Sequence, residues 1–76
     1  MNAVRRKKLA AIRESLEALQ TQLETLQEEE HEAYENLPEA LQEADKGQQS
    51  YEASEAIGDA ASCLSEAIDR IEAATE

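Results

Sequence analysis

Two apolar patterns in this chain of 76 residues mirror each other, and together they restrict the fold to a pair of antiparallel helices. The first pattern has spacings of 3, 4, 3, 4 and 3 and comprises Leu9, Ile12, Leu16, Leu19, Leu23 and Leu26. The second has spacings of 4, 3, 4, 3 and 4 and comprises Ile57, Ala61, Leu64, Ile68, Ile71 and Thr75. Residues three and four apart lie on one face of an α-helix, so each pattern predicts a helix with an apolar seam.

Antiparallel pairing of the two seams places each residue of one opposite a residue of the other. The position numbers of the six pairs add up to 83 or 84, from Leu26 with Ile57 to Leu9 with Thr75. A single bend close to position 42 produces this register. The sequence therefore predicts an all-α fold in which residues 1–76 form one helical hairpin.

The first long helix is expected over about residues 3–35. Asn2 is a suitable N-cap, because its side-chain oxygen can accept a hydrogen bond from a free backbone N–H group. No Gly or Pro occurs before Pro38, and the intervening residues are good helix formers. Pro38 ends the helix, because proline disfavours helical geometry in the residue that precedes it.

The turn is expected over residues 36–47 and contains a short helix that begins near Pro38. The second long helix is expected over about residues 48–74. Gly47 is read as the end of the turn, since glycine commonly terminates helices. The alternative is that Asp45 caps the second helix, with Gln48 three residues later.

A stripe of small residues beside the seam of the second helix predicts self-association. A helix that packs on a single partner needs a narrower apolar face than this one has. A two-helix chain of this length also buries little surface by itself. We therefore expect a homodimer in which two hairpins form a four-helix bundle; the alternative is that alanine serves helix propensity alone. The stripe comprises Ala53, Ala56, Ala60, Cys63 and Ala67.

The formal net charge is −11, and the acidic residues concentrate around the predicted bend. Eleven acids and no Lys or Arg occur from Glu14 to Asp45, whereas residues 5–8 are all basic. We expect the basic residues to lie beside Asp69, Glu72 and Glu76 of the second helix, where the charges offset each other. The acidic stretch repels nucleic acid and anionic membranes and favours a basic protein surface as partner. The alternative is a solvated face with no partner.

The candidate partner-binding residues lie in and before the bend. Tyr34 and Tyr51 are expected to lie near each other, and tyrosine is well suited to the centre of an interface. The alternative is that this pair only packs the turn. Glu30 falls on the apolar seam, opposite Ser54, and is expected to end the core. The candidates that would supply charge are Glu28, Glu29, Glu30, Glu32, Glu35, Glu39 and Glu43, and the apolar ones are Tyr34, Leu37 and Leu41.

No arrangement of residues is typical of catalysis. Glu28 and His31 have the spacing found in di-iron bundles, but both are expected to point into solvent and no second His occurs. Cys63 has no basic neighbour that would activate its thiol, and a phosphate-binding glycine loop is absent. We therefore expect no enzymatic activity, no metal and no cofactor. A lone cysteine, no long apolar run and a strongly charged N-terminus predict a cytoplasmic location.

The stretch from Glu28 to Gln42 reads Glu-Glu-Glu-His-Glu-Ala-Tyr-Glu-Asn-Leu-Pro-Glu-Ala-Leu-Gln. It resembles the turn of a family of small acidic helical proteins of bacteriophages and prophages, in which a Leu-rich helix precedes this turn and an Ala/Ile-rich helix follows it. The resemblance implies a bacterial host and, by association, inhibition of a host enzyme; it implies no catalytic residues. The leading hypothesis is a non-catalytic acidic inhibitor that binds a basic, nucleic-acid-binding host protein. The alternative is a self-associating structural protein with no other target.

Overall fold

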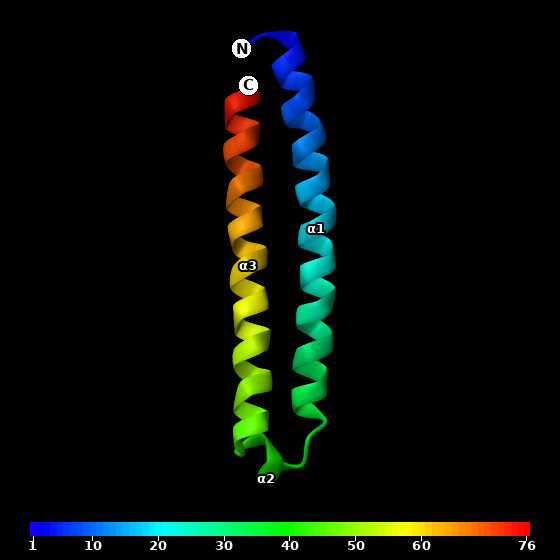
Figure 1. Ribbon diagram of the computed structural model, residues 1–76, viewed down its shortest axis with the longest axis vertical. Coiled ribbons are helices and arrows are strands. Elements are labelled where there is room, and N and C mark those ends of the chain that lie inside the picture. The colour runs from blue at the N-terminus through cyan, green and yellow to red at the C-terminus, as the bar shows by residue number, and fades with distance from the viewer.

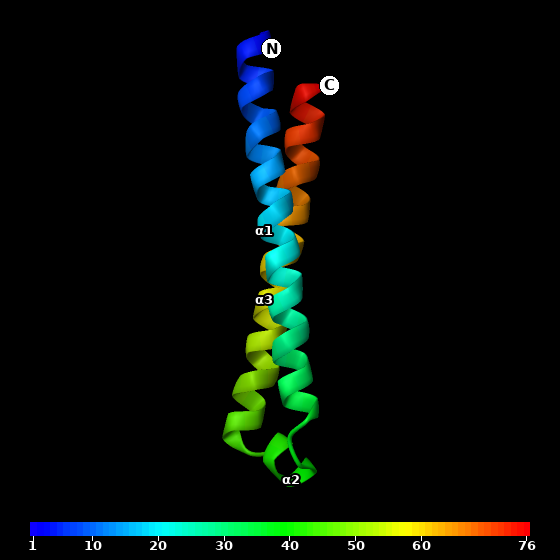
Figure 2. The same ribbon diagram turned by 90° about the vertical axis from the view of Figure 1, so that its right-hand side faces the viewer.

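The computed structural model describes residues 1–76 and contains three helices and no strand: α1 (Ala3–Glu35), α2 (Glu39–Gln42) and α3 (Asp45–Thr75). The long helices α1 and α3 run antiparallel and side by side, and they form a rod with extents of 58 × 14 × 13 Å (Figures 1 and 2). The short helix α2 lies at the closed end of the rod, and both termini lie at the open end. The predicted helical hairpin is thus confirmed.

The first long helix has the predicted bounds and the predicted cap. The side-chain oxygen of Asn2 accepts a hydrogen bond of 2.8 Å from the backbone N–H of Arg5. At the other end, the Gln42 amide lies within 3.1–3.3 Å of the carbonyl oxygens of Tyr34, Glu35 and Leu37. A side chain of the turn therefore donates to carbonyl groups at the end of α1 and just beyond it, where the helix supplies few donors; the Tyr34 carbonyl also accepts from the backbone N–H of Leu37.

The second long helix begins at Asp45, three residues before the expected start at Gln48, so Gly47 does not stop the turn. Gly47 is buried instead. A Cβ atom at this position would collide with the backbone carbonyl oxygens of Leu41 and Gln42. Because glycine lacks that atom, the first turn of α3 packs directly against the end of α2, and the chain reverses within a few residues.

The predicted seam of α3 is confirmed, because all six of its residues are buried or half-buried. Ala61 and Ile68 form the buried apolar core, with exposed fractions of 6% and 7%. Ser54 is also buried, one heptad before Ala61. The core is thin, and Ile68 is its one large side chain.

The predicted seam of α1 is half wrong. Leu9, Leu16 and Leu23 are half-buried as expected. Ile12, Leu19 and Leu26 are exposed, at 49%, 48% and 51%. The residue that follows each of these three faces α3 in its place. These following residues, Arg13, Gln20 and Gln27, are half-buried.

The residues at the turn explain this rotation of α1. Tyr34 and Leu37 are half-buried there. Tyr34 lies seven residues after Gln27, so burying Tyr34 also turns Gln27, Gln20 and Arg13 toward α3. Leu26 and its equivalents one and two heptads earlier are then carried to the side of the rod.

The register is otherwise close to the predicted one. Each half-buried position of the α1 seam can be paired with a buried or half-buried position of α3. The two position numbers then add up to 84, as for Leu16 with Ile68. Two contacts lie one residue away from this register: the Tyr34 ring against Tyr51, and Arg13 against Glu72. This register leaves residues 5–7 beyond the end of α3, so the first turns of α1 overhang the open end (Figure 1).

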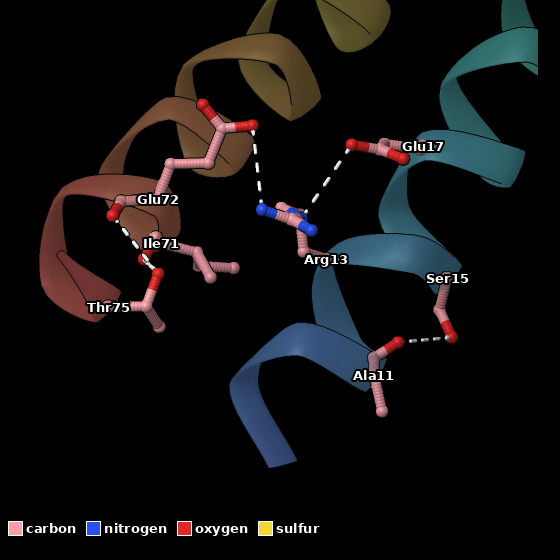
Figure 3. A network of polar contacts seen from close by, with 7 residues as sticks. All are labelled: Ala11, Arg13, Ser15, Glu17, Ile71, Glu72 and Thr75. Atoms are coloured by element: carbon pink, nitrogen blue, oxygen red, sulfur yellow. Dashed lines mark hydrogen bonds and ion pairs between the residues drawn. The ribbon is translucent and has the colours of Figure 1, made fainter. Parts of the chain in front are cut away.

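Arg13 lies on the seam close to two carboxylates (Figure 3), and its buried Nε atom has no hydrogen-bond partner. Its Nε atom lies 3.8 Å from Glu17 Oε1, and its Nη1 atom lies 3.8 Å from Glu72 Oε1. These are ion pairs rather than hydrogen bonds at that distance, and half-exposed pairs contribute only about 0–1 kcal/mol each. The expected pairing of residues 5–8 with α3 is wrong: none of the four forms an ion pair, because most of them extend past its end.

None of the helices combines the length and the apolar character that crossing a membrane requires.

Candidate acidic binding surface

The hairpin separates charge along its length. Residues 20–59, which form the closed half of the rod, contain twelve acidic residues and one base, Lys46. The rest of the chain contains six of each kind, so the closed half carries the entire formal charge of −11. We call residues 20–59 the acidic half. The Debye length is about 10 Å at 0.1 M salt and increases as the salt concentration falls. At low salt, the negative potential of the acidic half therefore extends well beyond its surface.

Acids of both long helices contribute to this surface. Glu28 and Glu32 are exposed on α1, and Glu52, Glu55 and Asp59 are exposed on α3. The sequence-based candidates ended at Glu43 and missed the three acids of α3. The register of the two helices could have identified these three acids. When the numbers of facing positions add up to 84, residues 52–59 lie beside residues 25–32.

Acids of both helices meet at a shallow groove of about 470 Å³ on one side of the acidic half. Glu28 and His31 line it from α1, and Glu55 and Asp59 line it from α3. Gly58 forms part of its floor beside the side-chain amide of Gln27. Three carboxylates around an open groove provide acceptors for the N–H groups of a lysine or arginine side chain.

Glu30 is placed differently from its exposed neighbours. It is half-buried, and its Oε1 atom accepts a hydrogen bond of 2.6 Å from the hydroxyl of Ser50. This contact joins α1 to α3 within the hairpin, with Ser50 as the side-chain partner rather than the expected Ser54. The carboxylate of Glu30 is thereby engaged in the fold.

The apolar candidates divide in the same way. The rings of Tyr34 and Tyr51 lie 5.6 Å apart at an angle of 57°, a tilted arrangement that aromatic pairs favour. Hydrogen bonding to Glu55, together with the charge of that carboxylate, raises the pKa of Tyr51 above its ordinary value of 10.0. Leu37 is half-buried beneath the turn, whereas Leu41 is 51% exposed on α2. Among the apolar candidates, Leu41 therefore has the most surface free for a partner.

The remaining acidic candidates are exposed, and one of them is paired. Glu35 Oε1 lies 3.0 Å from His31 Nε2, one helical turn away. Glu29, Glu39 and Glu43 are exposed and form no ion pair. No group of three or more His, Cys, Asp or Glu side chains is arranged to hold a metal ion.

The small-residue stripe of α3 lies on the surface of the hairpin. Ala53, Ala56, Ala60 and Cys63 are exposed, and Ala67 is half-buried. The four exposed residues lie outside the core between α1 and α3, which leaves them available to another chain.

Comparison with known proteins found no matching family model, no matching curated protein and no matching solved structure.

Proposed function

We propose that the protein is a non-catalytic binding protein whose acidic half engages a basic surface of another protein. The observation that carries this proposal is the segregation of charge: the whole net charge of −11 lies on residues 20–59. A surface of uniform sign accelerates encounter with a partner of opposite sign and disfavours partners of like sign. The partner class that fits best is a protein that itself binds nucleic acid, because its basic groove is shaped for phosphate charge.

The form of the acidic half supports this proposal. It is a narrow rod end, two helices wide, with exposed carboxylates on both helices. A basic cleft that neutralises the phosphates of a nucleic acid can accept carboxylates in their place. We propose that the acidic half enters such a cleft and occludes it, with Leu41 in apolar contact at the tip. The resemblance of the turn to small acidic phage proteins suggests a bacterial host protein as the target.

The test is affinity capture from a bacterial lysate with immobilised protein at low and high salt. The triple variant Glu28→Gln, Glu32→Gln, Glu43→Gln removes three exposed, unpaired charges from the acidic half. Exposed charge pairs contribute about 0.2–1 kcal/mol each, so losing three of them should lower affinity for the captured basic protein by about 3-fold to 150-fold. The salt dependence of binding should also decrease.

The matched control is the triple variant Glu14→Gln, Asp69→Asn, Glu76→Gln. It changes the net charge by the same amount, but all three residues lie outside residues 20–59, in the part of the chain that carries no net charge. This variant should keep its affinity. Equal losses in both triple variants would mean that binding responds to total charge alone, and unchanged binding in the first variant would remove the acidic half from consideration.

A self-associating structural protein is the second candidate function. The exposed side chains Ile12, Leu19 and Leu26 favour it, because water contact with large apolar residues at regular spacing is unfavourable. In the capture experiment, recovery of this chain alone at both salt concentrations would support that candidate over the first.

A further inference from the structure

A line of large apolar side chains on α1 has no partner within the hairpin. Ile12, Leu19 and Leu26 are each about half exposed, at 49%, 48% and 51%. They follow one another at intervals of seven residues, so they lie along one side of the helix. Their exposure is therefore a continuous apolar line rather than a set of isolated surface residues.

The small-residue stripe of α3 lies on the same side of the rod. The opposite side is identified by its contacts: Glu17 and Glu72 meet Arg13 there, and His31 and Gly58 line the groove. Ile12 precedes Glu17 by five residues, and Leu26 precedes His31 by five. Five residues rotate an α-helix by about 140°, so the apolar line points away from the groove.

The same offset applies to α3. Ala53 precedes Gly58 by five residues, and Ala67 precedes Glu72 by five. Because α1 and α3 are antiparallel, the two helices turn these lines toward a common side. We call this surface the apolar flank; it comprises Ile12, Leu19 and Leu26 of α1 with Ala53, Ala60, Ala67 and Ala74 of α3.

The surface area of the hairpin exceeds that of a compact monomer. Its accessible surface is 5703 Å². A typical monomer of the same 8.4 kDa mass exposes roughly 4,600 Å². The difference of about 1,100 Å² is larger than the roughly 800 Å² that each partner buries in a standard protein interface. One further contact along the apolar flank would bring the chain to an ordinary surface area.

The charges indicate how a second copy would be oriented. Arg5, Arg6 and Lys7 overhang the open end without an ion pair, and no acid lies in the first turn of α1. Cations at a helix N-terminus are unfavourable without a counter-charge. Two copies in the same direction would place two acidic halves side by side. Two copies in opposite directions place each basic overhang near the acidic half of the other.

We propose that the apolar flank binds a second copy of the chain in the inverted orientation, which forms a four-helix bundle with two-fold symmetry. A two-fold axis across the rod stacks α1 on α1 and α3 on α3 of the partner copy. Leu19 then meets its own counterpart near the axis, and Ile12 meets Leu26. The small side chains of Ala60 and Ala67 allow the two α3 helices to approach closely.

Sedimentation equilibrium tests the assembly, from micromolar to millimolar protein. The wild-type chain should have twice the 8.4 kDa mass of one chain. Leu19→Glu should return the mass to that of one chain, because it places two carboxylates at the centre of the interface. Ala18→Glu is the matched control: it adds the same charge one residue away, on the outer surface of α1, and should leave the dimer intact.

A second measurement does not depend on how any variant folds. The melting temperature of the wild-type chain should rise with protein concentration, since assembly stabilises the folded state. A wild-type mass of one chain with a constant melting temperature would overturn the proposal. A dimer that Leu19→Glu leaves intact would rule out the apolar flank as its interface.

Orientation is measured by the distance between two identical spin labels in the dimer. A label on Glu32→Cys, in a chain that also carries Cys63→Ser, lies thirteen residues from Leu19. At 1.5 Å per residue, inverted copies separate the two labels by about 40 Å. A separation under about 25 Å, or two helix diameters, would show copies in the same direction and overturn the inverted arrangement.

Discussion

Gly47→Ala is expected to lower the melting temperature of the hairpin by about 4–24 °C. The added methyl group would collide with the carbonyl oxygens of Leu41 and Gln42, which are backbone atoms and cannot rotate away. Forced repacking of this kind costs about 1–3 kcal/mol, and each kcal/mol shifts the melting temperature of a small domain by about 4–8 °C. Thermal melting followed by circular dichroism measures the change.

Gly58→Ala is the matched control, because it makes the same substitution within the same helix. The methyl group at Gly58 would meet only the side-chain amide of Gln27, which is flexible and can move. Alanine is favoured over glycine inside a helix by about 1 kcal/mol, so this variant should be more stable than the wild type. Equal destabilisation by the two substitutions would mean that the close approach of α2 to α3 is not what requires glycine at position 47.

Ile68→Ala is expected to destabilise the hairpin by about 2–4 kcal/mol, the usual cost of truncating a buried isoleucine. Ile68 is 7% exposed and is the largest side chain of the buried core. So thin a core has no second cluster to take over its contribution. Urea denaturation should show a lower midpoint, because the loss is a large fraction of the stability of a small domain.

Val4→Ala provides the comparison for that measurement. Val4 is 63% exposed near the open end of α1. Its truncation removes apolar carbon atoms that are not packed against α3, and alanine is the better helix former. The midpoint should therefore stay the same or rise slightly. If Ile68→Ala shifts the urea midpoint no more than Val4→Ala does, the packing of Ile68 is not what stabilises the contact between α1 and α3.

The hairpin was predictable because its two seams are long and share one register. Six positions on α3 were identified correctly, and so was the cap at Asn2. The error on α1 has a definite origin: Leu and Ile occur on two adjacent lines, and periodicity cannot say which line faces α3. The half-burial of Tyr34 at the turn decides it, and a heptad count back from Tyr34 to Gln27 would have found the correct phase.

Gly47 was misread for a related reason. Glycine after a polar turn is typical of a helix end, and its alternative role as a site of close approach depends on where α2 lies. The acidic surface was half predictable. The acids around Glu28 form a visible run, whereas Glu55 and Asp59 are scattered along α3 and become part of the groove only through the fold.

The position of the chain ends has a practical consequence for measuring any of these interactions. Both termini lie at the open end, and the rod is 58 Å long. A bulky domain fused to either terminus is thus held a full rod length from the closed end of its own chain. In the inverted dimer the same fusion stands beside the turn of the other copy. Fusions of increasing size therefore test the orientation of the dimer. They should obstruct the binding of another protein at the turn only when the two chains are inverted.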